Sequence, residues 1–136
     1  MANIQGRVTC DSSGVIYLIN DKICHRSSVG SCITDFKTRW GNHKSHIRHD
    51  PPTCQISIHF NGEFHDIVKN PLNEFDIALS NHLEVIIIEE VSFGDAKGYA
   101  RVPILKSRES YWQNQFNTFE SFGGLNKRDA KVEIRN

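Results

Sequence analysis

The sequence predicts one small α/β domain, because short runs rich in β-branched residues alternate with two stretches of helical periodicity. The chain has 136 residues, of which 38% are hydrophobic. This suits a single modest core and leaves no comfortable room for a second domain. No repeat, linker or low-complexity tract interrupts the chain. We therefore expect residues 1–136 to fold as one unit.

Two strands are predicted near the start of the chain, between residues 15 and 30, and a third at residues 83–90. Residues 15–20 follow a turn-forming cluster and are rich in β-branched side chains, and residues 27–30 are their expected hairpin partner. Residues 83–90 include four consecutive aliphatic residues, so neither face is polar, and such a strand belongs in the middle of a sheet. Residues 55–60 predict a short extended segment, and residues 91–103 an exposed connection.

The first predicted helix starts near residue 36, where Thr34 or Asp35 can cap it, and the prolines at positions 51 and 52 end it. Its core-facing residues recur at i, i+4, i+7 and i+11. They are Phe36, Trp40, His43 and Ile47.

Residues 105–119 predict the second helix, and a carboxylate lies on its apolar stripe. Glu109 is four residues after Leu105 and three before Trp112, and the stripe continues through Phe116 and Phe119. An unpaired buried carboxylate costs on the order of several kcal/mol, so such a residue has a cation, a metal or a strong donor. Two readings stay open here: a salt bridge to Arg39 or Arg108, or a functional site.

Arg39 and His43 lie one turn apart on the first helix, so both side chains can reach the same patch. A guanidinium suits a phosphate because its planar fork donates two hydrogen bonds and stays charged. The alternative is a solvated arginine beside a histidine at the edge of the core.

Composition narrows the classes of protein. Sixteen Lys and Arg balance sixteen Asp and Glu, so a nucleic-acid partner would need a local basic patch. The longest apolar run is far too short to cross a membrane, and the N-terminus lacks the layout of a signal peptide. We expect an intracellular chain without a membrane partner, in which the four cysteines and seven histidines favour metal ligation over disulfides.

A set of fragments in order along the chain resembles the GIY-YIG nucleases. The fragments include Gly-Val-Ile-Tyr at 14–17, Ser-Val-Gly at 28–30, Arg-Glu-Ser-Tyr-Trp at 108–112 and Gly-Leu-Asn at 124–126, and the resemblance covers residues 10 to about 128. It implies a central antiparallel sheet of about three strands flanked by helices. The positions that match the family's functional residues are Tyr17, Arg39, His43, Glu109 and Asn126.

The resemblance implies a metal-dependent DNA endonuclease that hydrolyses one phosphodiester and leaves a 3′-hydroxyl. Glu109 would hold Mg²⁺ or Mn²⁺, and Arg39 would neutralise the phosphate. Tyr17 would orient or deprotonate the attacking water, for which positive charge must lower its pKa from about 10. His43 would relay a proton, and Asn126 would hold its neighbours. The expected DNA contacts are Lys44, Arg48, Lys127 and Arg128.

Within that family the chain looks most like the endonuclease domain of Penelope-like retroelements, in the segments 10–19, 54–65 and 108–128. This implies a domain excised from a longer polypeptide that includes a reverse transcriptase, acting in target-primed reverse transcription, and nuclear if the source is a eukaryote. It also implies a structural zinc site with Cys24, His59 and His65 as ligands. Cys10 or Cys54, or failing these His25, would be the fourth.

Ser28 departs from the family pattern, because it stands where a second tyrosine is expected. A serine hydroxyl lacks the reach and the acidity of a phenol. Three explanations stay open: a degenerate copy, a deliberately altered one, or an active enzyme in which His25 or a water fills the gap. The alternative functions are a zinc-stabilised DNA-binding module and a generic GIY-YIG repair or restriction nuclease.

Overall fold

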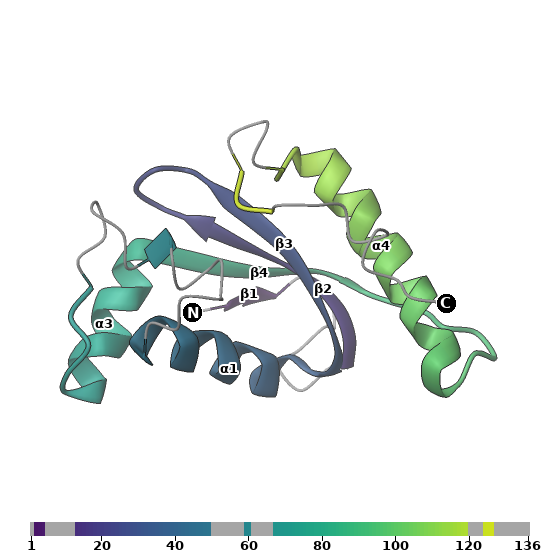
Figure 1. Ribbon diagram of the computed structural model, residues 1–136, viewed down its shortest axis with the longest axis horizontal. Coiled ribbons are helices and arrows are strands. Elements are labelled where there is room, and N and C mark those ends of the chain that lie inside the picture. Colours follow the sequence, from purple (N-terminus) through teal and green to yellow (C-terminus); the bar gives the residue numbers. More distant parts are fainter. Residues whose placement is uncertain (1, 5–12, 50–58, 61–66, 120–123, 127–136) are drawn as a thin grey trace.

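A computed structural model describes residues 2–4, 13–49, 59–60, 67–119 and 124–126 (Figure 1). It confirms the α+β class. The described strands form one sheet in the order β1-β4-β2-β3. Helices cover both faces of the sheet, with α1 and α3 on one side and α4 on the other (Figure 1).

The sheet is built on the predicted hairpin. β2 (Ser13–Asp21) and β3 (Ser27–Asp35) pair antiparallel, β4 (Leu83–Glu90) pairs antiparallel to the other side of β2, and the short β1 (Ala2–Ile4) runs parallel to β4. The central position predicted for residues 83–90 is therefore confirmed. β3 is an edge strand of this sheet.

Alternation along β2 divides the core into two layers. Val15, Tyr17 and Ile19 point toward α1 (Phe36–His49) and α3 (Leu72–His82). Ile16 and Leu18 point toward α4 (Arg101–Phe116). Neighbouring residues of one strand thus serve opposite faces of the domain.

The predicted stripe of α1 is confirmed. Phe36, His43 and Ile47 are buried, and Trp40 is half-buried against the same layer. Asp35, the residue before the helix, accepts a hydrogen bond from the Thr38 hydroxyl at 2.9 Å. The helix ends at His49; the two prolines beyond it lie outside the described residues.

The sequence analysis did not predict α3. Phe75 and Leu79, one turn apart, are its buried residues. The spacing of Leu72, Phe75 and Leu79 was the available signal, but Leu72 is 51% exposed and only a short stripe remains. The helix runs directly into β4 at Leu83, so no loop separates it from the strand that was predicted there.

α4 differs from its predicted bounds at both ends. It begins at Arg101, because Pro103 falls in the first turn, where a missing N–H costs nothing. It ends at Phe116, because Asn117 adopts a left-handed conformation with φ 52°. The buried stripe therefore excludes Phe116, which is 43% exposed, and includes Gln113 instead. None of the helices in the described residues has the length and apolarity to cross a membrane.

The extended segment predicted at 55–60 is wrong at its end, where His59 and Phe60 are helical. Phe60 is buried in the same layer as Tyr17, and a helical turn allows it to insert there. Residues 55–58 lie outside the described part of the chain.

Candidate active site

Tyr17 in the middle of β2 is the centre of a buried polar network. Its hydroxyl lies 2.7 Å from Nε2 of His43 and accepts a hydrogen bond from Nε of Arg39 at 3.3 Å. Both partners come from α1, one turn apart, as their spacing predicted. The tyrosine ring is 2% exposed and packs against Phe36, with ring centroids 5.0 Å apart. The hydroxyl is therefore held by its ring and by two side chains.

Gly30 makes room for the tyrosine. It is the cross-strand partner of Tyr17 in β3, and a Cβ added to it would lie 2.6 Å from both Cζ and Oη of Tyr17. Such contacts are too close for any other residue type. The glycine of the Ser-Val-Gly fragment is thus required by the position of the Tyr17 side chain.

Burial sets the protonation of the pair. It raises the pKa of Tyr17 from 10.0 to about 12, although Arg39 acts in the opposite direction. Arg39 thus lowers this pKa as expected, but burial outweighs it, and the phenol is not acidified. Burial also lowers the pKa of His43 from 6.5 to about 4, with Arg39 and His46 adding to the effect. At neutral pH the site contains a neutral phenol beside a neutral imidazole.

The network favours one direction for the proton between them. Arg39 already donates to the Tyr17 oxygen, so the phenolic hydrogen is free to point at Nε2 of His43. This assigns the hydrogen of the imidazole to Nδ1, an atom with no hydrogen-bond partner among the described residues. Tyr17 then donates to His43 and accepts from Arg39.

Glu109 on α4 is buried, as predicted, with 5% of its surface exposed. Its Oε1 accepts hydrogen bonds from the Ser31 hydroxyl and from Nζ of Lys106, the latter at 3.2 Å. The proposed salt bridge to Arg108 is wrong, because that guanidinium binds Glu89 on β4. Sequence reasoning missed Lys106, although its place one turn before Glu109 was the available signal.

A second polar cluster fixes α4 on the sheet. Arg108 makes a two-pronged contact with the Glu89 carboxylate, at 2.9 and 3.0 Å from Nε, and Trp112 donates to the same carboxylate at 2.7 Å. These contacts lie on both sides of Glu109 along the helix. They orient α4 so that the intervening carboxylate faces Ser31.

The two halves of the site meet at the free edge of β3. Tyr17 lies on the α1 face, whereas Ser31, which pairs with Ile16, points to the α4 face. A hollow of about 300 Å³ joins the two faces there. Its lining is Ser31, Cys32, Ile33 and Thr34 of β3, Arg39 of α1, and Val102, Leu105 and Lys106 of α4.

The comparisons with known proteins identify the fold. No protein-family model matches the chain, and no curated protein matches it either. A solved structure does match: the catalytic domain of the intron endonuclease I-TevI, in a mutant form, a GIY-YIG domain. The TM-score is 0.55, and the match covers 84% of this chain and 92% of that one at 21% sequence identity. The chain has the GIY-YIG nuclease fold.

Within this GIY-YIG fold, Asn126 binds two residues of β3 and one beyond α4. Its Oδ1 accepts hydrogen bonds from the Val29 amide at 2.9 Å and the Thr118 hydroxyl at 2.6 Å. Its Nδ2 donates to the Val29 carbonyl at 3.1 Å and to the Ser28 hydroxyl at 3.2 Å. Ser28, where the resemblance predicts a tyrosine, thus accepts a hydrogen bond from Asn126. His25 is exposed in the turn between β2 and β3, with φ 61°.

A second constellation in the GIY-YIG fold has the composition of a metal centre. One ligand atom each from Asp21, Cys24 and His59 lies within 4.8 Å of the others. Nε2 of His59 is 2.7 Å from Oδ2 of Asp21 and 3.7 Å from Sγ of Cys24. The predicted pair Cys24 and His59 is brought together. His65, Cys10 and Cys54 lie outside the described residues.

Sequence reasoning missed Asp21, which is 0% exposed at the end of β2. Burial alone would raise the pKa of Asp21, but hydrogen bonds from Cys24, His59 and Ile23 outweigh it and lower the pKa to about 2. The carboxylate is ionised at neutral pH although it is closed to solvent. A charged oxygen, an imidazole and a thiol at this spacing fit three positions of a zinc site.

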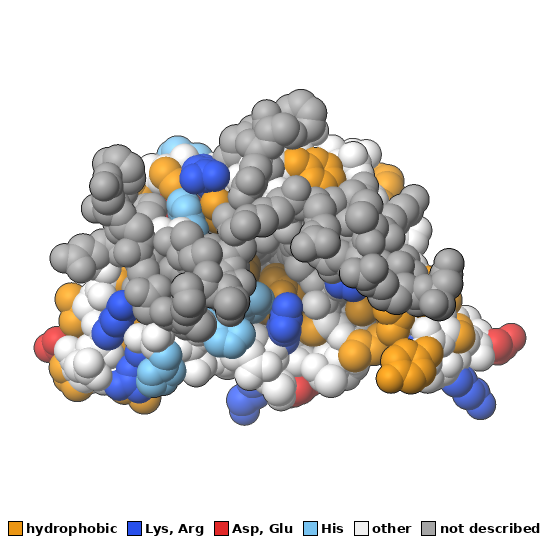
Figure 2. All heavy atoms as spheres, in the orientation of Figure 1, with side chains coloured by type: hydrophobic (Ala, Val, Ile, Leu, Met, Phe, Trp, Pro, Cys, Tyr) orange, Lys and Arg blue, Asp and Glu red, His pale blue; other side chains and the backbone are white. Residues whose placement is uncertain are grey.

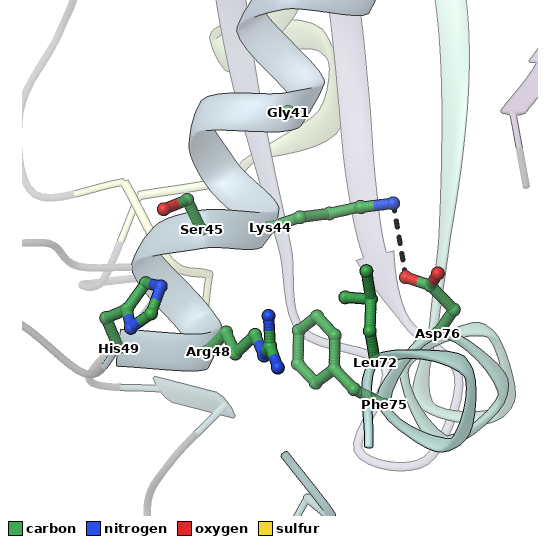
Figure 3. Close-up of a pocket in the computed structure, with 8 residues that line it drawn as sticks. All are labelled: Gly41, Lys44, Ser45, Arg48, His49, Leu72, Phe75 and Asp76. Atoms are coloured by element: carbon green, nitrogen blue, oxygen red, sulfur yellow. Dashed lines mark ion pairs between the residues drawn. The ribbon is translucent and has the colours of Figure 1, made fainter. Parts of the chain in front are cut away.

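Two of the predicted DNA contacts lie at a different hollow of about 230 Å³, between α1 and α3 (Figure 3). Lys44 pairs with Asp76 at 3.2 Å, and Arg48 donates to the Lys69 carbonyl and to Oδ1 of Asn70, both at 3.0 Å. Lys127 and Arg128 lie outside the described residues.

α1 as a whole is rich in basic side chains. It contains no Asp or Glu, and Figure 2 shows Lys, Arg and His side chains gathered over it on the viewed face. Arg39, which lines the hollow at β3, belongs to the same helix. The chain therefore has a local basic patch although its net charge is zero.

Proposed function

We propose that this protein is a metal-dependent DNA endonuclease that nicks one strand and leaves a 3′-hydroxyl. The observation that carries the proposal is one hollow lined by the hydrogen-bond partners of two buried groups, Tyr17 and Glu109. Arg39, which donates to Tyr17, lines this hollow on one side, and Ser31 and Lys106, which hold the Glu109 carboxylate, line it on the other.

The network supports a proton relay for water attack. A phenol with a pKa of about 12 does not ionise at neutral pH, so Tyr17 takes a proton from water only as it passes its own to Nε2 of His43. The neutral imidazole accepts that proton, and Tyr17 is a neutral phenol again afterwards. Arg39 then donates to the phosphate as negative charge develops on it.

The residues around Glu109 fit a hard divalent ion. A carboxylate and a serine hydroxyl supply oxygen ligands beside a hollow that has room for water and a phosphate. When bound there, Mg²⁺ or Mn²⁺ supplies Lewis-acid polarisation of the phosphate and stabilises the leaving oxygen. Ser31 and Lys106 fix the direction in which the carboxylate faces.

The biological setting is retroelement mobility. The resemblance to Penelope-type endonucleases supports a domain that works beside a reverse transcriptase in one polypeptide, in the nucleus of a eukaryote, where the 3′-hydroxyl serves as primer. A structural zinc ion at Asp21, Cys24 and His59, completed by His65, Cys10 or Cys54, belongs to the same proposal.

Nicking of supercoiled plasmid in Mg²⁺ or Mn²⁺ tests the proposal. The control is Glu109→Gln, which keeps the shape of the side chain and one oxygen for Ser31 but removes the charge. We expect open-circular DNA from the wild type and at least about a hundredfold less from the variant. Equal nicking by both proteins would assign the activity to a contaminant and overturn the proposal.

Ser28 favours a second candidate, a zinc-stabilised DNA-binding module without catalysis. Its hydroxyl is tied to Asn126 and is much shorter than the phenol that the family pattern expects. Binding of a DNA duplex without nicking, together with nicking by Ser28→Tyr, would support this candidate over the first.

A further inference from the structure

Lys106 faces the Glu109 carboxylate, and the resemblance to GIY-YIG nucleases assigns it no role. Its ammonium lies 3.2 Å from Oε1 of Glu109, the same oxygen that Ser31 binds. It stands three residues before Glu109, so both side chains leave α4 on the same face. Lys106 also lines the hollow at the edge of β3 together with Arg39.

The two side chains differ in how firmly they are enclosed. The Glu109 side chain is 7% exposed and held by Ser31, whereas that of Lys106 is 24% exposed at the rim of the hollow. A lysine stem has four rotatable carbons, and its ammonium binds as a point charge without a fixed geometry. Lys106 can therefore turn away from Glu109 into the hollow without a shift of the helix.

A divalent ion held by the Glu109 carboxylate would lie close to the Lys106 ammonium, which binds the same group. Like charges within a few ångströms of each other repel strongly where water is partly excluded. The ion and Lys106 therefore compete for the carboxylate. In the absence of an ion, Lys106 supplies the charge that a buried carboxylate needs.

We propose that Lys106 is a phosphate-binding residue that the metal releases from Glu109. In the metal-free protein it holds the carboxylate. When a divalent ion takes Glu109, the ammonium turns to a DNA phosphate in the hollow, beside Arg39. The proposal rests on the proposed function, because it assumes that Glu109 binds the metal and that the hollow receives DNA.

Mn²⁺ binding to the DNA-free protein tests the exchange without any turnover. Titration calorimetry compares the wild type with Lys106→Met, and only the binding that Glu109→Gln abolishes is counted, which excludes the cluster at Asp21. We expect Lys106→Met to bind Mn²⁺ about threefold to tenfold more tightly, because a competing charge is gone. Lys106→Arg, which keeps the charge, should stay within about twofold of the wild type.

DNA affinity and nicking should change in the opposite direction from Mn²⁺ affinity. In Mn²⁺, Lys106→Met should bind a duplex several-fold more weakly and nick it more slowly, while Lys97→Met, an exposed lysine before η1 (Gly98–Ala100), should match the wild type in both. A purely structural role would lower metal and DNA binding together, with a lower melting temperature.

The outcomes separate this inference from the proposed function. Suppose that the wild type binds Mn²⁺ at Glu109 and nicks DNA, but Lys106→Met leaves Mn²⁺ affinity unchanged or weaker. The proposed release of Lys106 by the metal is then wrong, whereas the proposed endonuclease function is supported. If Glu109→Gln changes neither Mn²⁺ binding nor nicking, both are overturned.

Discussion

The hydroxyl of Tyr17 and Nε2 of His43 lie 2.7 Å apart, and both side chains are buried. Both groups are neutral at pH 7, because burial raises the pKa of the phenol to about 12 and lowers the pKa of the imidazole to about 4. A proton can move between them only if another reaches Tyr17 from outside. The pair is thus ready to transfer a proton but does not ionise by itself.

Tyr17→Phe tests the hydroxyl alone. The ring keeps its contacts with Phe36 and Gly30, so the fold should survive at a cost of about 1–3 kcal/mol for the unpaired His43 nitrogen. We expect nicking to fall at least about a hundredfold while duplex affinity changes little. Tyr111→Phe, at a 45% exposed position on α4, is the matched control and should keep full activity. Undiminished nicking by Tyr17→Phe would exclude the relay.

His43 should make stability depend on pH in the acid range. Its pKa is depressed in the folded protein, so its contribution to the free energy of unfolding is complete above 6.5 and is lost as the pH falls through about 4. Urea unfolding of wild type and His43→Gln should differ most at pH 7. The difference should shrink by up to about 3 kcal/mol at pH 4. His49→Gln, at an exposed position, should follow the wild type, and a pH-independent difference would contradict the prediction.

Gly30→Ala should disturb the site more than the fold. The new methyl group would meet Cζ and Oη of Tyr17 at 2.6 Å, so the ring must move and its hydroxyl leaves His43. We expect a loss of about 1–3 kcal/mol in unfolding free energy and a large loss of nicking. Gly41→Ala is the control, since nothing lies within 4 Å of a Cβ there and alanine favours the helix. Normal nicking by Gly30→Ala would show that the position of Tyr17 does not matter.

Metal removal should destabilise the protein through the cluster at the end of β2. We expect one zinc per chain by mass spectrometry, and chelation should lower the melting temperature by about 5 °C or more. Cys24→Ser should lose the zinc, whereas Cys32→Ala, at a buried cysteine in the core, should retain it. If the zinc content and melting temperature of Cys24→Ser equal those of the wild type, the cluster is not a metal site.

Periodicity predicted the parts of the fold that a single face defines. α1 buries one regular set of side chains, and Glu109 was recognised because it interrupts such a set on α4. β2 and β4 were predicted from runs of β-branched and aliphatic residues instead, and β2 buries side chains on both faces. Periodicity failed where the backbone conformation ends a helix early or where a helix buries few residues. Asn117 stops α4 before the predicted stripe is complete, and α3 has too few buried residues to be distinguished.

The partners of the site residues were harder to predict than the residues. Arg108 was a plausible partner for Glu109 by proximity in sequence, but a strand carboxylate, Glu89, captures it. Lys106 then remains for Glu109. Asp21 and Cys24 are three residues apart in one turn, but His59 joins them only through the tertiary fold, which no local spacing encodes. Such choices depend on tertiary placement and are absent from the pattern of one segment.

The contacts of Asn126 with β3 have a consequence for how copies of this chain meet. The amide of Asn126 occupies the N–H and the C=O of Val29, the two groups through which another strand would extend the sheet. Beyond that point, the border of β3 from Ser31 to Thr34 lines the hollow instead. One side chain thus blocks strand addition next to the opening. A strand that paired with the remaining stretch of β3 would cover the hollow that we propose receives DNA, so edge-to-edge aggregation of this domain and loss of the proposed nicking activity should occur together.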